Sequence, residues 1–84
     1  MNLFNYNPKG KGQANSMAVT IQGITYYFSY STCIAVLADG KLSYARNEWG
    51  PTTGKHINWA KAAGGFQDSE QVNASDLACE GVTI

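Results

Sequence analysis

The strongest constraint in this sequence is a series of short strand-like segments between residues 17 and 47, separated by very short connections. From Ile24 to Tyr30 the side chains alternate with a period of two and are β-branched or aromatic, which is typical of a strand. Asp39-Gly40 is the clearest hairpin signal, because a type I′ turn needs positive φ at both central positions. The sequence therefore predicts an antiparallel meander of four strands: Met17–Gln22, Ile24–Tyr30, Cys33–Ala38 and Lys41–Asn47.

The residues after the meander favour a loop and then helices. Gly50-Pro51 stops the last strand, since proline cannot donate to a strand ladder. Thr52 or Thr53 can cap a helix over Lys55 to Ala63. A second short helix is expected over Ser69 to Glu80 with Asp68 as its cap, and the last three residues can add an edge strand. The predicted fold class is α+β, a small antiparallel meander sheet of about four strands followed by one or two short helices.

A chain of 84 residues is one domain in length. Residues 5–16 are rich in Gly, Asn and Lys, so residues 1–16 are predicted to form a flexible N-terminal arm and residues 17–84 a single α+β domain. A domain this small leaves much of its surface exposed, which makes a homodimer a reasonable expectation.

The charges of the chain are segregated although they sum to zero. Residues 1–61 hold all six bases and two acids (+4), and residues 62–84 hold four acids and no base (−4). One interpretation is attraction between the two parts inside the fold. The others are a basic face for nucleic acid or an acidic face for a basic protein partner.

The N-terminal residues, the length of the apolar runs and the two cysteines bear on the cellular compartment of the protein. The N-terminal residues show no apolar signal segment, and no run approaches the 18 or so apolar residues of a membrane helix. We therefore expect a cytoplasmic protein that does not enter a membrane. Cys33 is expected to pack as a small hydrophobic residue, and the sequence does not decide whether it forms a disulfide with Cys79.

The motifs that carry chemistry are weak. The segment from Gly50 to Lys55 has three residues between its glycines where a P-loop needs four, and His56 follows where a hydroxyl is required. Thr52, Thr53 and Lys55 can still attract an anion at a helix start, although helix capping is the favoured interpretation. His56 is the single histidine, and the spacing provides neither a triad nor a zinc signature around it. The sequence predicts no catalytic residue, no metal and no cofactor.

The aromatic residues are more informative. Alternation places Tyr26, Phe28 and Tyr30 on one side as core candidates and leaves Tyr27 on the other, predicted to be exposed. Exposed tyrosine near Arg46 has the composition of a binding hot spot, and also of a platform on which bases stack. Trp49 is predicted to plug the gap between sheet and helix. The alternative to a binding surface is that about half of these aromatic residues only cover a thin hydrophobic core.

The run from Tyr27 to Asn58 resembles small proteins of unknown function encoded by tailed bacteriophages and related mobile elements. The elements that carry the resemblance are Ser29–Ala35, the Asp39-Gly40 hairpin, Asn47-Glu48-Trp49 and a Thr-Thr-Gly-Lys-His-x-Asn loop at Thr52–Asn58. The resemblance implies a phage or plasmid origin, hence the host bacterial cytosol, and no catalytic residue.

These observations lead to a prediction of function. The chain is expected to be a non-enzymatic, phage-type binding protein, such as a stoichiometric inhibitor of a host defence complex of the anti-CRISPR kind. The alternatives are a small nucleic-acid-binding module, with weak binding, and a virion or regulatory accessory protein; an enzyme built around His56 is a third. The predicted partner-binding residues are Lys55, His56, Thr52, Thr53, Tyr27 and Arg46.

Overall fold

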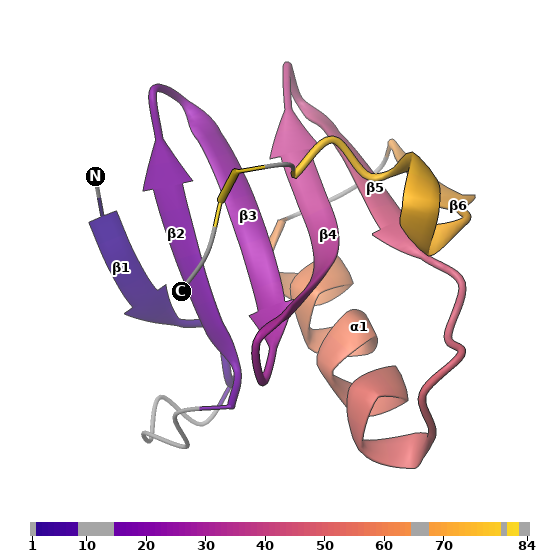
Figure 1. The fold of residues 1–84 in the computed structure, drawn as a ribbon. Coiled ribbons are helices and arrows are strands. Elements are labelled where there is room, and N and C mark those ends of the chain that lie inside the picture. The colour runs from indigo at the N-terminus through magenta and orange to yellow at the C-terminus, as the bar shows by residue number, and fades with distance from the viewer. Residues whose placement is uncertain (1, 9–14, 65–67, 80, 83–84) are drawn as a thin grey trace.

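The protein is built on one six-stranded sheet with a helix on one face (Figure 1). The structure is a computed structural model that describes residues 2–8, 15–64, 68–79 and 81–82. The strands lie side by side in chain order from β1 to β6. The elements are β1 (Asn2–Asn5), β2 (Met17–Ile21), β3 (Ile24–Ser29), β4 (Thr32–Ala38), β5 (Lys41–Ala45), α1 (Pro51–Ala63), β6 (Ser69–Val72) and a short 3-10 helix η1 (Ala74–Asp76). The α+β class is confirmed, but the sheet has two more strands than predicted.

The predicted meander is confirmed as β2 to β5. Gln22-Gly23 and Asp39-Gly40 have positive φ at both residues, so both form the turns that a tight hairpin favours. A third connection of two residues, Tyr30 and Ser31, joins β3 to β4. Next to it the pairing shifts, because Tyr27 faces Ala35 while Phe28 faces Cys33. This bulge leaves Ile34 as the extra residue, and its side chain is fully buried.

The start of the chain is an edge strand, which corrects the prediction of a flexible arm for this part of it. β1 pairs antiparallel with β2, from Asn2 opposite Thr20 to Asn5 opposite Met17. Tyr6 follows with its ring buried, and its hydroxyl donates a hydrogen bond to the Phe28 carbonyl at 2.7 Å. Burial raises the pKa of the Tyr6 hydroxyl, which keeps it a donor. Residues 9–14 of the predicted arm lie outside the described residues.

The prediction of a second helix over residues 69–80 is wrong. Ser69–Val72 forms β6 instead, parallel to β5, after α1 has carried the chain across the sheet. Asp68 caps no helix, because its carbonyl accepts a hydrogen bond from Leu42 N–H at 2.9 Å. Hydrogen bonds to β5 satisfy the backbone of this segment, and local helix signals do not anticipate such long-range pairing. Of the predicted last strand, Val82 is not in a strand and residues 83–84 lie outside the described residues.

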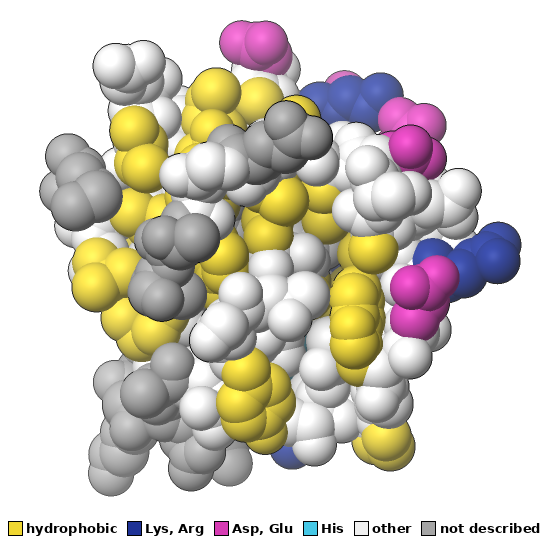
Figure 2. Space-filling model, viewed as in Figure 1, with side chains coloured by type: hydrophobic (Ala, Val, Ile, Leu, Met, Phe, Trp, Pro, Cys, Tyr) yellow, Lys and Arg dark blue, Asp and Glu magenta, His cyan; other side chains and the backbone are white. Residues whose placement is uncertain are grey.

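The two faces of the sheet are covered by different parts of the chain (Figure 1). On one face α1 packs its Ile57 and Ala60 against Tyr27 and Leu42. The segment after β6 crosses the other face, where Leu77 packs with Val36 and Ala45. Figure 2 looks onto this second face, and its charged side chains gather on the side of β5 and β6.

The cysteines pack against the second face. Cys33 and Cys79 are partly buried free thiols of the cluster around Leu77. Burial, and next the neighbouring Cys79, raise the pKa of Cys33, so its thiol stays protonated and weakly nucleophilic.

Candidate functional site

The β3–β4 turn and the outer side of α1 together surround a surface hollow of about 270 Å³. Four side chains from these two elements are reachable from solvent around it. We call them the turn–helix rim: Tyr30, Thr52, Lys55 and Trp59. Asn7, Asn15 and an edge of His56 complete the lining.

Tyr30 is the most unusual residue of the rim. It is the first of the two residues that join β3 to β4, and its φ is 56°, a backbone region that favours glycine. Its N–H donates to the Asn15 carbonyl at 2.9 Å, which ties the turn to the chain before β2. A side chain in this conformation costs roughly 1–2 kcal/mol. The ring is nevertheless 53% exposed, so burial of the ring does little to offset that cost.

The two rings of the rim pack on either side of the buried His56 ring. The Tyr30 ring centre lies 6.0 Å from that of His56, which in turn lies 5.2 Å from that of Trp59. The Lys55 ammonium lies 5.7 Å from the centre of the Trp59 ring, within the range of a cation–π contact. Aromatic contacts of this kind restrict the rotamers of the rim, so these side chains are presented in a defined arrangement.

A buried polar cluster supports the rim from below. The Ser29 hydroxyl lies 2.7 Å from His56 Nδ1 and 3.1 Å from the Thr53 hydroxyl, and all three side chains are buried. These hydrogen bonds join the end of β3 to the first turns of α1. Burial, and next the positive charge of Lys55, lower the pKa of His56. The imidazole is therefore neutral at pH 7, and its Nδ1 can accept the hydrogen bond from Ser29.

The Ser29–His56 pair has two components of a nucleophilic triad but not their accessibility. Ser29 is 2% exposed and His56 is 4% exposed, so a substrate cannot approach the hydroxyl in this conformation. Within residues 2–8, 15–64, 68–79 and 81–82, no carboxylate hydrogen-bonds or pairs with His56. We therefore interpret the pair as a structural link that fixes α1 against β3.

The Thr52–Asn58 motif, expected to be a loop, lies in helix, because α1 begins at Pro51 rather than at Lys55. Neither threonine caps it: Thr53 bonds to Ser29, and Thr52 is exposed. The Asn47 side chain shapes the connection instead. Its Oδ1 accepts from the N–H groups of Trp49 and Gly50 at 3.0 and 3.2 Å, and its Nδ2 donates to the Gly50 carbonyl at 2.9 Å.

The structure brings together part of the predicted binding set. Lys55 and Thr52 are exposed on the rim, and Thr53 is buried beneath it. Arg46 is exposed after β5, outside the hollow of the rim. Predicting His56 as a surface contact was wrong, because the imidazole is buried. Trp49 is 42% exposed, so the prediction that it plugs the gap between sheet and helix is wrong as well.

Tyr27 and Tyr30 exchange the places that alternation predicted for them. Tyr27 is 2% exposed under α1, with its ring edge-on to Tyr6 at 5.2 Å, while Tyr30 faces solvent. Both faces of the sheet are covered by other parts of the chain. The alternation of side chains along a strand therefore cannot show which side of that strand is exposed. The missed signal is the polar run Ser29-Tyr30-Ser31-Thr32, which interrupts the apolar pattern and marks a turn without Gly, Asn or Asp.

Within the part of the chain that the structure describes, no group of three or more His, Cys, Asp and Glu side chains is placed to hold a metal ion. No helix among the described residues is long and apolar enough to cross a bilayer.

Comparison with known proteins finds a family match. Residues 1–76 match a family model described as a family of unknown function (DUF8033). No curated protein and no solved structure matches the chain.

Proposed function

The chain belongs to a family of unknown function, DUF8033, and we propose that it acts as a non-enzymatic binding protein whose contact surface is the turn–helix rim. The observation that carries this proposal is Tyr30, an exposed aromatic residue held at a backbone position that disfavours it. Backbone strain of this kind is common at functional positions. Gln22 and Asp39 have a similar φ, and Tyr30 differs from them in presenting an exposed aromatic ring there.

The composition of the rim supports a protein partner. Tyrosine and tryptophan are enriched in binding hot spots, where they bury large areas with few rotatable bonds. Tyr30 and Trp59 are fixed by contacts with His56, so little side-chain entropy is lost on binding. Lys55 adds one charge beside the rings, which helps to orient a partner.

The class of partner follows from the resemblance of Tyr27–Asn58 to bacteriophage proteins. We propose a host protein in the bacterial cytosol, in particular a defence complex that this chain inhibits by occupying one of its surfaces, as anti-CRISPR proteins do. A virion or regulatory accessory role would use the same binding surface. The motif that carries the resemblance, Thr52–Asn58, contributes Thr52 and Lys55 to the rim.

Nucleic acid is the second candidate, because exposed rings beside a lysine can also stack bases. The rim contains a single charged residue, Lys55, which can neutralise about one phosphate. Binding through so few phosphate contacts is weak and nearly independent of salt. We therefore rank a protein partner above nucleic acid.

Capture from a bacterial lysate tests the proposal. Tagged wild-type protein, a Thr52→Ala/Lys55→Ala rim variant and a Lys41→Ala control outside the rim are used as baits, each with and without nuclease, and captured proteins are identified by mass spectrometry. The proposal predicts a protein that survives nuclease, is retained by the control and is depleted by the rim variant. Capture that disappears on nuclease treatment would favour nucleic acid. Equal capture by all three baits would remove the rim from consideration.

A further inference from the structure

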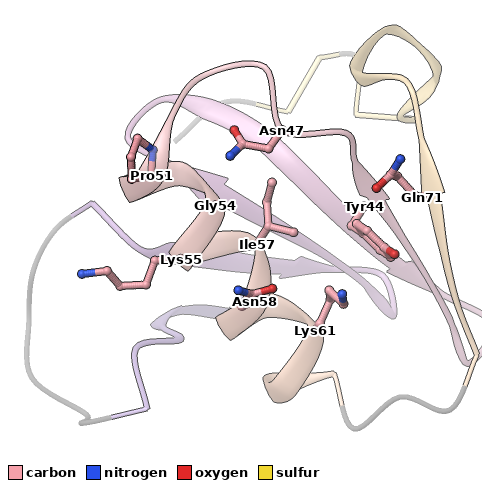
Figure 3. Close-up of a pocket in the computed structure, with 9 residues that line it drawn as sticks. All are labelled: Tyr44, Asn47, Pro51, Gly54, Lys55, Ile57, Asn58, Lys61 and Gln71. Atoms are coloured by element: carbon pink, nitrogen blue, oxygen red, sulfur yellow. The ribbon is translucent and has the colours of Figure 1, made fainter.

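A second hollow, of about 490 Å³, lies on the other side of Lys55 (Figure 3). Its polar lining comes from three elements and one connection: Tyr44 of β5, Asn47, the α1 residues Lys55, Asn58 and Lys61, and Gln71 of β6. Figure 3 shows Asn58 between the two lysines along α1, with Tyr44 and Gln71 across from Lys61. Because Lys55 lines both hollows, this second one continues the surface of the rim.

Gly54 contributes to the shape of this hollow. A Cβ atom there would lie 2.8 Å from Asn47 Nδ2, closer than a real Cβ contact. That nitrogen is held by its hydrogen bond to the Gly50 carbonyl, so it cannot move away freely. The absence of a side chain at Gly54 therefore lets Asn47 lie against α1 and form one wall.

The hollow is positively charged and contains no acid. No residue that lines it is Asp or Glu, and α1 has no acidic residue along its length. Among the described residues, neither Lys55 nor Lys61 has a carboxylate within 4 Å; the single ion pair there joins Lys41 to Glu70. The two ammonium groups lie over rings instead, Lys61 at 4.6 Å from Tyr44 and Lys55 at 5.7 Å from Trp59. Both charges are thus available to an anionic ligand.

The spacing of the two lysines indicates the form of that ligand. They are six residues apart on α1, which is about 9 Å along the axis at 1.5 Å per residue. Two charges so far apart do not converge on one compact anion. A peptide in the extended polyproline II conformation rises about 9 Å over three residues and returns to the same side after each turn, so carboxylates three residues apart match the axial spacing of both lysines. Asn58 and Gln71 lie between them with amide groups that can both donate to and accept from a peptide backbone.

We propose that this hollow binds an acidic, extended peptide segment of a protein partner, with carboxylates at Lys55 and Lys61 and its main chain on the amides of Asn58 and Gln71. The inference rests on the proposed binding function and adds the chemistry of the partner. Charge complementarity carries it, since an acid-free basic hollow beside an aromatic rim selects an acidic segment.

A defined peptide tests the inference without knowledge of the partner. The probe is a fluorescein-labelled peptide of about four Glu-Gly-Ser repeats, and the control peptide has Gln in place of Glu. Affinity is measured by fluorescence anisotropy, and the contact is mapped from the amide signals of Asn58 and Gln71 in ¹H–¹⁵N NMR spectra. Lys55→Gln and Lys61→Gln remove the two charges, and Lys41→Gln is the matched charge control outside the hollow.

The inference predicts that the Glu peptide binds and the Gln peptide does not, with shifts at Asn58 and Gln71. Each lysine substitution in the hollow should weaken binding by about two- to fivefold, as expected for exposed charge pairs, and Lys41→Gln should not. Added salt should weaken binding in parallel.

Other outcomes overturn the inference. No binding of the Glu peptide, or tighter binding of inorganic phosphate or an oligothymidylate, would show that the hollow does not select acidic peptide. Association of the protein with itself through this surface, detected by light scattering and abolished by Lys61→Gln, would make a second copy the occupant. Lys61 lines this hollow and not the rim, so the effect of Lys61→Gln separates failure of this inference from failure of the proposed function.

Discussion

The helix α1 covers one face of the sheet and the segment after β6 crosses the other, and the interiors of the two faces differ among the described residues. Under α1, the apolar side chains surround the buried cluster of Ser29, Thr53 and His56. On the opposite face, the cluster around Leu77 is apolar apart from its two thiols. The His56 ring of this cluster contacts both rings of the rim, Tyr30 and Trp59. The α1 face therefore stabilises the fold and also supports the proposed binding surface, whereas the described residues of the other face contribute apolar packing.

The largest expected effect separates the two faces by their apolar packing. Ile57 on α1 and Leu77 after η1 are almost equally buried, at 5% and 6% exposed. Both substitutions to alanine remove buried volume and should lower the free energy of unfolding by about 2–5 kcal/mol. We expect Ile57→Ala near the upper end, because a regular helix cannot collapse into the cavity. Leu77→Ala should lie near the lower end, because it belongs to a short irregular segment that can adjust. Urea denaturation measures both, and a larger loss for Leu77→Ala would reverse the comparison.

A smaller effect is expected at the polar cluster. Ser29→Ala leaves His56 Nδ1 and the Thr53 hydroxyl without their shared partner in a buried place, which should lower the free energy of unfolding by about 1–3 kcal/mol. The control is Thr20→Val, which breaks the partly buried Thr20–Thr25 hydroxyl pair and should lose less than about 1 kcal/mol. Denaturant titration compares the two variants. Equal losses would mean that the cluster contributes no more than an ordinary hydroxyl pair.

The pH dependence of stability gives a third test of the polar face. Burial, and next Lys55, lower the pKa of His56 in the folded chain, while the unfolded chain keeps a value of about 6.5. As pH falls through about 6.5, the unfolded state takes up a proton that the folded state does not, so stability decreases towards lower pH. The free energy of unfolding should therefore be nearly constant between about pH 7.5 and 8 and fall between about pH 7 and 5.5. His56 is the only histidine, so His56→Gln should flatten this window. A free energy of unfolding that rises as pH falls would contradict a lowered pKa of His56.

The meander was predictable from sequence because its signals are local. Gln22-Gly23 and Asp39-Gly40 specify turns by their own backbone preferences, and the alternation of Ile24–Ser29 is a property of one strand. β6 was not predictable in this way. Its pairing with β5 depends on α1 returning the chain to the sheet edge, and the sequence of Ser69–Val72 alone has no strong strand preference.

The candidate site was predictable only in part, for a related reason. Lys55 and Thr52 stand out as polar residues near the predicted helix start, and both are exposed on the rim. The exposure of Tyr30 depends on the turn at Tyr30-Ser31 and on the nearby bulge, neither of which carries glycine. The burial of His56 depends on Ser29, 27 residues earlier, a distance over which spacing gives no information.

The central claim, that Tyr30 is held at a strained turn position for binding, is tested by Tyr30→Gly measured beside Gln22→Gly. Both residues have positive φ in two-residue turns, at 56° and 51°, but Gln22 lies outside the rim. Glycine relieves the strain and adds freedom to the unfolded chain, so both variants should have an unfolding free energy that is unchanged or higher by up to about 1 kcal/mol. The measurement is the affinity of each variant for the partner captured from lysate. The account predicts at least about tenfold weaker binding for Tyr30→Gly, roughly 1.4 kcal/mol, and no change for Gln22→Gly. Full affinity in a stable Tyr30→Gly protein would contradict it.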